Sequence, residues 1–344
     1  MPSTDKKQNG LQKSLALIFV YTVATGSIFT YVSYWDSVFF SYCGPGTFLA
    51  FALMTLAILP IALVYSEISP LFHTDGGELI YNIVGFNRHV GFLASWLIMA
   101  AWISVPPAVV MAIVTFISRT FGLGLTFGHT MIIGIIILVA VFLMSMQDIQ
   151  FLVKAQAVCL FANITTTLLT GVLLLFSGHW SFANVANLFQ TNLEPSAGIP
   201  GWIIGMALLI TPFFGFETVP QMVEEGDFPT SNTKKAICGS VLTCGTIYVF
   251  FFFCVAGLDS FQTLLSGDAQ NGFMTITAMQ NLLGWKIWPL IYGCVSILMG
   301  MTASILGFWM STARMLYSMG KKNFLPEIFT KVNSHQQPIL PNLF

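Results

Sequence analysis

Long apolar blocks separated by short polar stretches run through the whole chain. A helix needs about 20 apolar residues to cross the hydrocarbon core of a membrane, and eight blocks come close to or exceed that length. Of the 344 residues, 56% are hydrophobic and 8% are charged, whereas soluble domains carry roughly 25% charged residues. The pattern predicts an all-α, multi-pass integral membrane protein, and it argues against a soluble domain, a disordered chain and a nucleic-acid-binding protein. The predicted spans cover residues 15–41, 47–66, 89–118, 130–147, 152–177, 202–223, 237–258 and 287–313.

The basic residues are distributed unevenly between the two ends of these spans. If the N-terminus is cytoplasmic, only Arg119 and Lys286 of the 13 Lys and Arg residues fall on the outer side. Cytoplasmic loops are enriched in Lys and Arg. We therefore expect a single transmembrane domain over 1–344 in the cell (plasma) membrane, with a cytoplasmic N-terminus (1–14) and a cytoplasmic tail (314–344).

Two of the predicted spans contain residues that interrupt a helix. Thr25-Gly26-Ser27 interrupts the first span, and Thr211-Pro212-Phe213-Phe214-Gly215-Phe216-Glu217 interrupts the sixth. Proline removes a helix donor, and glycine tolerates unusual dihedral angles. Ordinary kinks would also account for either interruption alone. Paired breaks in corresponding spans are typical of transporter substrate sites, and an offset of five spans predicts a five-helix unit that repeats with inverted topology.

Glu217 is the most informative ionisable residue of the sequence. A carboxylate within a span is costly and usually functional, so we predict a role in proton uptake and release. The alternative is a structural carboxylate that accepts hydrogen bonds from an unwound backbone. Trp102, in the third span, is interpreted as core packing rather than as the wall of a cavity.

The other acidic residues near the spans are expected to be hydrated. Asp36, near the outer end of the first span, either lines an outer vestibule or is solvated at the interface. Glu224, Glu225 and Asp227 follow the sixth span and are expected to be solvated. The apparent lack of further buried acids disfavours a polyamine substrate.

The sequence lacks the motifs of several other functional classes. None of the five histidines falls in the middle of a predicted span, and there is no His-x-x-x-His, Gly-x-Ser-x-Gly or Gly-x-x-x-x-Gly-Lys sequence. The sequence therefore gives no sign of an intramembrane protease, a zinc site or an ATP-driven pump. We expect no enzyme activity, no metal site and no cofactor.

Three further stretches carry a family resemblance. The first covers residues 65–96 and includes Gly76-Gly77-Glu78. The second is Phe214-Gly215-Phe216-Glu217 with Glu224-Glu225 and Pro229 after it, and the third is Ala313-Arg314-Met315-Leu316-Tyr317 followed by Phe324-Leu325-Pro326. In order and spacing, the chain resembles the amino acid–polyamine–organocation superfamily of secondary transporters, the amino acid permeases.

The resemblance implies a leucine-transporter-like fold of two inverted five-helix repeats. Residues 15–177 would form the first repeat, and 202–313 would form spans six to eight of a second repeat that is truncated after span eight. The substrate would be held between the first and sixth spans. The contacts carried over by position are Thr25, Gly26, Ser27, Ile28, Ala100, Ala101, Phe213, Phe214, Gly215 and Phe216. Glu217 matches the family's sixth-span glutamate, which the resemblance links to gating or proton coupling.

The sequence departs from the family pattern in four respects. The family's first-span break usually reads Gly-Ser-Gly-Ile-Phe, whereas residues 25–29 read Thr-Gly-Ser-Ile-Phe. Asn163 stands where many proton-coupled members carry a lysine. The sodium-linked relatives need hydroxyl ligands in the eighth span, which Thr302 and Ser304 could supply, although Ser and Thr are common in membrane helices. The family typically has twelve spans, whereas eight are predicted here.

The sequence therefore predicts a secondary active transporter of amino acids that works by proton-coupled symport or by exchange, through alternating access. A polyamine or amine transporter and a transport-inactive permease fragment with a binding or interaction role are the alternatives. A channel is disfavoured because it needs a continuous polar lining. The expected partners are a small-molecule substrate, the lipid bilayer and protons, with no nucleic acid, and the oligomeric state is left open.

Overall fold

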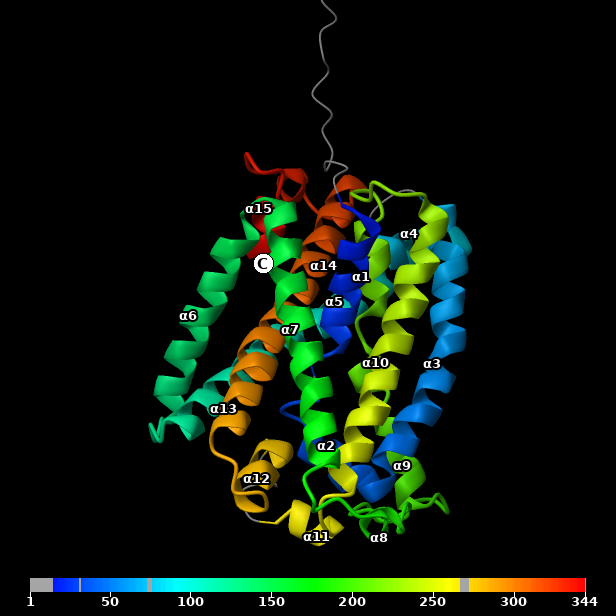
Figure 1. Ribbon diagram of the computed structural model, residues 1–344. Coiled ribbons are helices and arrows are strands. Elements are labelled where there is room, and N and C mark those ends of the chain that lie inside the picture. The colour runs from blue at the N-terminus through cyan, green and yellow to red at the C-terminus, as the bar shows by residue number, and fades with distance from the viewer. Residues whose placement is uncertain (1–14, 31, 73–75, 267–271, 344) are drawn as a thin grey trace, which may run out of the picture.

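The computed structural model describes residues 15–30, 32–72, 76–266 and 272–343, and the named elements in them are all helices (Figure 1). By length and composition, seven helical segments could cross a membrane, and α1 is a shorter apolar helix. This confirms the all-α membrane class. The α-helices are α1 (Leu17–Ile28), α2 (Asp36–Cys43), α3 (Thr47–Ile68), α4 (Gly77–Gly85), α5 (Arg88–Thr120), α6 (Phe127–Ser145), α7 (Ile149–Leu175), α8 (Phe182–Val185), α9 (Gly201–Leu208), α10 (Thr233–Ala256), α11 (Phe261–Leu264), α12 (Met274–Asn281), α13 (Ile287–Gly293), α14 (Met301–Lys321) and α15 (Ile339–Leu343). The 3₁₀ segments are η1 (Gly44–Gly46), η2 (Ser69–Leu71), η3 (Thr211–Phe213), η4 (Phe216–Met222), η5 (Thr230–Asn232) and η8 (Glu327–Thr330), and η7 (Cys294–Gly300) is a π-helix that joins α13 to α14.

The first predicted span is two helices, and the break between them lies later than expected. Thr25-Gly26-Ser27 is helical, because α1 continues to Ile28 and α2 begins only at Asp36. The hydroxyls of Thr25 and Ser27 donate to carbonyls four residues earlier, so these side chains add bonds along the helix. The prediction of a break at residues 25–27 is therefore wrong by several residues.

The eighth span is longer than predicted. It runs through α13, η7 and α14 to Lys321 rather than ending at residue 313. Arg314, assigned to the cytoplasmic tail from its charge, is a fully buried residue of α14. A buried carboxylate neutralises it, as described below, so the charge did not mark the end of the helix.

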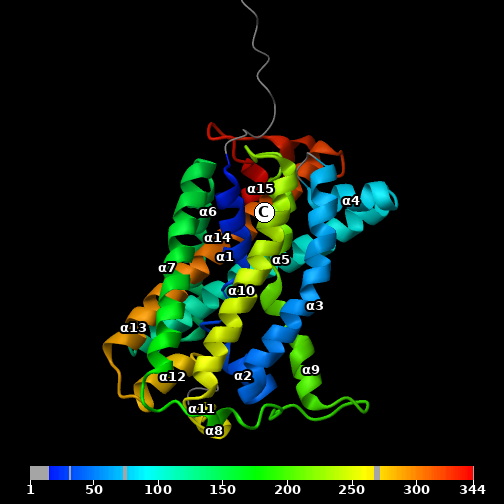
Figure 2. The same cartoon turned by 45° about the vertical axis from the view of Figure 1, so that its right-hand side comes forward.

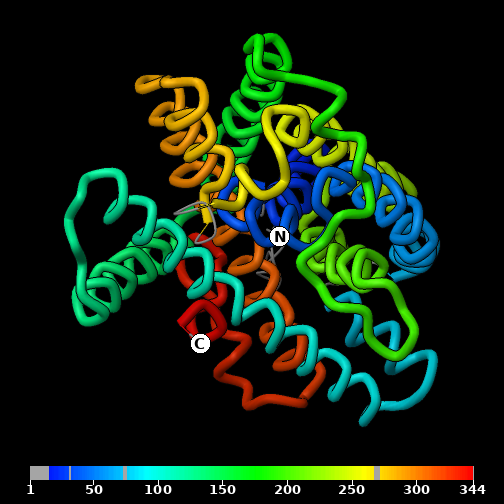
Figure 3. Tube along the Cα trace, turned by 90° about the horizontal axis from the view of Figure 1, so that it is seen from below, coloured from blue at the N-terminus to red at the C-terminus, as the bar shows by residue number. Residues whose placement is uncertain are grey.

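The helix α1 lies inside the bundle and packs on α7, α10, α14 and η4. Figure 3 shows α1 (dark blue) surrounded by other helices, with α6 set to one side. The buried apolar residues of α1 belong to one large apolar cluster that extends through α3, α7 and α10. Both broken spans therefore meet in the middle of the molecule.

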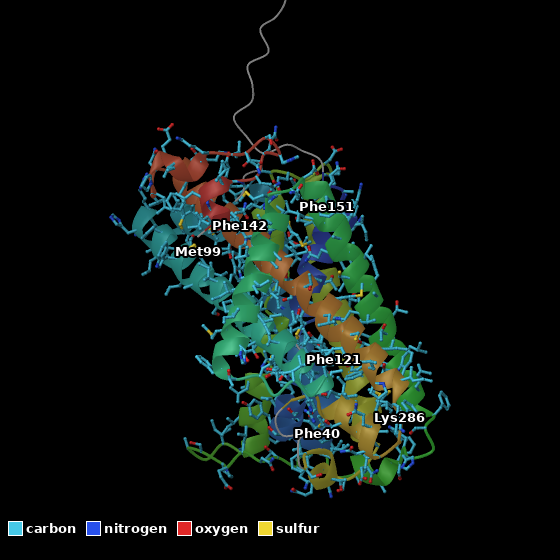
Figure 4. All side chains as sticks on the ribbon, turned by 90° about the vertical axis from the view of Figure 1, so that its left-hand side faces the viewer. Phe40, Met99, Phe121, Phe142, Phe151 and Lys286 are labelled. Carbon is cyan, nitrogen blue, oxygen red and sulfur yellow. The ribbon has the colours of Figure 1, made fainter. Side chains whose placement is uncertain are left out.

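The connecting segments gather at two opposite ends of the bundle. The start of α1, α4 and α15 lie at one end, and α8, α11 and α12 lie at the other (Figures 1 and 2). Figure 4 shows Lys286 toward one end of the bundle and Phe151 toward the opposite end. Lys286 is one of the two basic residues that the sequence assigns to the outer side.

Candidate functional site

The sixth span is broken where Pro212 and Gly215 predict it. The helix α9 ends at Leu208, and the chain continues through η3 and η4 with Phe214 extended between them. Gly215 has a φ of 137°, which L side chains rarely adopt. Peptide groups at the break therefore lack the hydrogen-bond partners that a continuous helix would provide.

The broken segment also packs closely on α1. A Cβ atom built on Gly215 would lie 2.7 Å from the Cβ of Ser27 and 2.9 Å from the nitrogen of Ile28. Only a glycine can therefore occupy this position without moving one of the two spans. The structure brings Ser27, Ile28 and Gly215 together, as the resemblance implied.

Tyr248 of α10 lies between the two breaks. Its hydroxyl lies 2.6 Å from the carbonyl oxygen of Ile28 and 3.3 Å from that of Pro212 and can donate to either. Its ring stacks on Phe29 and contacts Phe213 edge-on. Sequence reasoning missed Tyr248, because a tyrosine in an apolar span carries no local signal of such a role.

The last carbonyl groups of α1 receive further side-chain donors. The last carbonyls of a helix lack intrahelical partners. The Asn163 amide donates to the carbonyl of Phe29 at 3.4 Å, and the Ser304 hydroxyl donates to that of Ser27 at 3.4 Å. Asn163, noted only as a replacement for lysine, thus contacts the first break directly. Thr302 instead donates within its own helix, to Leu298.

Glu217 is buried beside the sixth-span break with two neutral donors. Trp102 donates its indole N–H to Oε1 at 3.0 Å, and the backbone N–H of Gly215 donates to Oε2 at 2.8 Å. The side chain is 6% exposed. Trp102 therefore positions the carboxylate in addition to packing in a small apolar cluster.

The remaining predicted substrate contacts differ in burial. Phe213 and Phe216 are buried, whereas Phe214 is exposed. Thr25 and Gly26 are buried in α1. Ala100 and Ala101 are both exposed on α5, and the structure shows neither of them packed against the breaks. The next residue, Trp102, is the one that reaches Glu217.

Asp36 is completely buried, so both predicted environments for it are wrong. Its carboxylate accepts from the backbone nitrogens of Ser37, Met274 and Thr275 at 2.8, 3.0 and 2.7 Å. Two of these nitrogens belong to the first turn of α12, whose positive end favours an anion. Asp36 therefore fastens α2 to α12.

Glu225 is buried as well, contrary to the prediction that it is solvated. Its two oxygens accept from Nε and Nη2 of Arg314 at 2.8 and 2.9 Å. Its backbone carbonyl accepts from the nitrogen of Leu15, and the nitrogen of Asp227 donates to the carbonyl of Leu15. The chain after η4 thus connects the start of the first span to the eighth.

A third acid, Glu78, is also buried, and sequence reasoning missed it. Glu78, in the first turn of α4, is 5% exposed and accepts from the amide of Gln221. The lack of buried acids therefore no longer argues against a polyamine substrate. Within residues 15–30, 32–72, 76–266 and 272–343, no three His, Cys, Asp or Glu side chains are grouped as a metal site would require.

Comparison with known proteins decides the family. A family model described as amino acid permease matches residues 10–341. The chain belongs to the amino acid permease family. This match agrees with the seven membrane-length apolar segments in the described part of the chain.

Several curated relatives of the permease are named as transporters. It is 24% identical over 307 residues to the glutamate/serine transporter AimA of Bacillus subtilis, covering 84% of this chain and 56% of that one. It is 23% identical to the cationic amino acid transporter 3, mitochondrial, of Arabidopsis thaliana (86% and 49%). It is 24% identical to the aspartate-proton symporter of Bacillus subtilis (95% and 64%). The permease thus spans about half to two thirds of the length of these relatives.

Proposed function

We propose that this permease is a secondary active transporter of amino acids that works by alternating access. The substrate binds between the C-terminal end of α1 and the break between α9 and η4. The contact of Ser27 and Ile28 with Gly215 is the observation that carries the proposal, because it joins the two interrupted spans in a protein-lined interior. Interrupted helices offer peptide N–H and C=O groups to the charged ends of an amino acid.

Side chains already occupy the carbonyl groups that would receive the substrate's amine. Tyr248 and Asn163 donate to the carbonyls of Ile28 and Phe29. An amine could replace these donors when the two breaks separate. The described conformation, with Gly215 against Ser27, then corresponds to a closed site.

Glu217 is proposed to couple transport to a proton. Its two partners are neutral donors, and no lysine occupies position 163 to share the task. One relative is named as a proton symporter, which supports proton-coupled symport over exchange. Protonation would remove the charge that now holds Trp102 and the Gly215 nitrogen, and would thereby loosen the sixth-span break.

The proposed orientation places the end with α4 and α15 in the cytoplasm and the chain in the cell membrane. The proposed domain arrangement keeps residues 15–177 as a first five-span repeat and 202–313 as spans six to eight of a second, inverted repeat. The distribution of Lys and Arg supports the orientation.

Uptake by the purified full chain in proteoliposomes tests the proposal. With an inward proton gradient we expect saturable uptake of labelled glutamate, serine, leucine or arginine, and Glu217→Gln should lower it at least about tenfold, a barrier change of roughly 1.4 kcal/mol. Glu194→Gln, at an exposed glutamate in the loop before α9, is the matched control and should transport normally.

Each other outcome contradicts a part of the proposal. Uptake of putrescine without uptake of amino acids would show that the substrate is a polyamine rather than an amino acid. Unsaturable ion current would indicate a channel. A folded chain that binds amino acids without transporting them would indicate a binding or interaction role.

A further inference from the structure

We propose that Glu78 is a second proton-binding carboxylate of this permease, protonated in the described conformation and able to exchange its proton with water at the end of the bundle where α4 lies. The proposal rests on the proposed transport function for its role in the cycle. The protonation itself can be tested without transport.

The helix α4 is docked closely on η4, the second half of the sixth span. A Cβ atom on Gly77 would overlap the ring of Pro220 and lie 3.2 Å from the amide nitrogen of Gln221. Gly76, with a φ of 92°, turns the chain into this contact. Glu78 is therefore held against η4 and out of water.

The hydrogen bonding of Glu78 and Gln221 is complete only if Glu78 carries a proton. The Gln221 amide nitrogen donates to Oε2 of Glu78. Oε1 of Glu78 and Oε1 of Gln221 are both buried without a hydrogen-bond partner, and a buried unsatisfied acceptor is costly. A proton on Oε1 of Glu78 supplies the donor that the Gln221 oxygen lacks. A neutral carboxylic acid and a primary amide can then pair through two hydrogen bonds.

The charges around Glu78 also favour the neutral acid. Burial and, to a smaller extent, the charge of Glu217 raise the pKa of Glu78 to about 8, although interactions with its own backbone, the nearby Tyr65 hydroxyl and the Gln221 amide oppose the rise. The ionisable groups that face it are Tyr65 from α3, Tyr81 from α4 itself and Glu217 from η4.

Cations on the other neighbouring helices have different partners. Arg88 of α5 donates to the carbonyls of Lys322 and Asn323 and lies over the ring of Phe324. Lys321 of α14 donates to Glu224. His89 of α5 is exposed. Because these cations have other partners, we infer that a proton neutralises Glu78.

A movement of α4 away from η4 would release the proton. The O–H bond of Glu78 breaks, water at that end of the bundle takes the proton, and a carboxylate that water can solvate remains. Gln221 lies one turn after Glu217 in η4, so the two carboxyl groups flank the same segment. The proton of Glu78 and the state of the sixth-span break are thereby linked.

Infrared difference spectra of the purified full chain test the protonation directly. We expect a carboxylic-acid carbonyl band that disappears with a midpoint near pH 8. Glu78→Gln should abolish this titration, and Glu194→Gln should leave it intact. Glutamine is a neutral isostere of the protonated acid, so E78Q should fold and pair with Gln221.

Two outcomes would overturn the proposal. One is an E78Q protein that keeps the titration near pH 8. The other is an E78Q protein that fails to fold. A site that holds a neutral carboxylic acid should accept glutamine, so this failure would contradict the proposal. Proteoliposome uptake then adds the link to transport, since E78Q should flatten the pH dependence of uptake between pH 6 and 9 at least about threefold. If no variant transports, the proposed function fails while the infrared result on Glu78 still stands.

Discussion

Four carboxylates, Asp36, Glu78, Glu217 and Glu225, are buried in the described part of the chain, and each has a different set of partners. Asp36 accepts from backbone N–H groups, Glu225 accepts from a guanidinium, Glu217 accepts from an indole and a backbone N–H, and Glu78 accepts from the Gln221 amide. The first two sets stabilise an anion. Glu217 and Glu78 lack a cationic partner among these bonds, which is why they are the two carboxylates that we propose to bind and release protons.

Glu78 should give the folded protein a characteristic dependence on pH. Its pKa is about 8 in the folded chain and about 4.5 as an ordinary glutamate, so between these values the folded state binds a proton that the unfolded state has lost. The free energy of unfolding should therefore fall as pH rises from about 4.5 through 8, by up to about 1.4 kcal/mol per pH unit. Thermal unfolding in detergent from pH 5 to 9 measures this.

The matched comparison is E78Q, which should lose this part of the slope and become relatively more stable at pH 9. An identical pH dependence in the two proteins would show that Glu78 does not hold the proton.

Single residues also show what the sequence could and could not predict. Glu217 could be selected because it lies inside an apolar span. Glu78 and Glu225 could not, because they lie in polar stretches whose burial depends on distant partners, Gln221 and Arg314. In sequence, these residues have the same appearance as solvated surface acids.

At the scale of elements, the break between η3 and η4 depends on one glycine. Gly215→Ala would place a Cβ 2.7 Å from that of Ser27 at a φ of 137°. We expect a loss of roughly 1–3 kcal/mol in the free energy of unfolding and uptake reduced more than tenfold. Denaturant unfolding and proteoliposome uptake measure the two effects.

Gly128→Ala, in α6, is the control for that change. Nothing lies within 4 Å of a Cβ at Gly128, so alanine should be neutral or slightly stabilising through its helix propensity. Equal behaviour of the two alanine variants would contradict the role assigned to Gly215.

The two breaks differ in how far the sequence predicts them. Pro212 and Gly215 act on their own backbone, so the sixth-span break could be placed from local residues. The first-span break depends on donors from α7, α10 and α14, since Asn163, Tyr248 and Ser304 satisfy the carbonyls there. No property of residues 25–29 alone identifies these partners.

At the scale of the whole molecule, the ion pair of Glu225 and Arg314 joins spans six and eight. Both side chains are buried, so Arg314→Met would leave an uncompensated carboxylate and should cost about 3–5 kcal/mol. The double change Arg314→Met with Glu225→Leu should recover most of that loss. A double-mutant cycle in the free energy of unfolding measures the coupling.

Lys321→Met is the surface comparison, because its pair with Glu224 is partly exposed. It should change stability by about 0–1 kcal/mol. If Lys321→Met lowered the free energy of unfolding more than Arg314→Met, the buried pair would not be the more important of the two for stability.

The backbone pairing of Leu15 with the chain after η4 has a mechanical consequence. Leu15 both donates to Glu225 and accepts from Asp227, and Glu225 in turn holds Arg314. Separating the start of α1 from this end of the molecule therefore requires breaking two backbone hydrogen bonds, which lie next to the ion pair of Glu225 and Arg314. The two bonds of Leu15 join backbone atoms, so Arg314→Met and Glu225→Leu should remove the ion pair and leave these two hydrogen bonds in place.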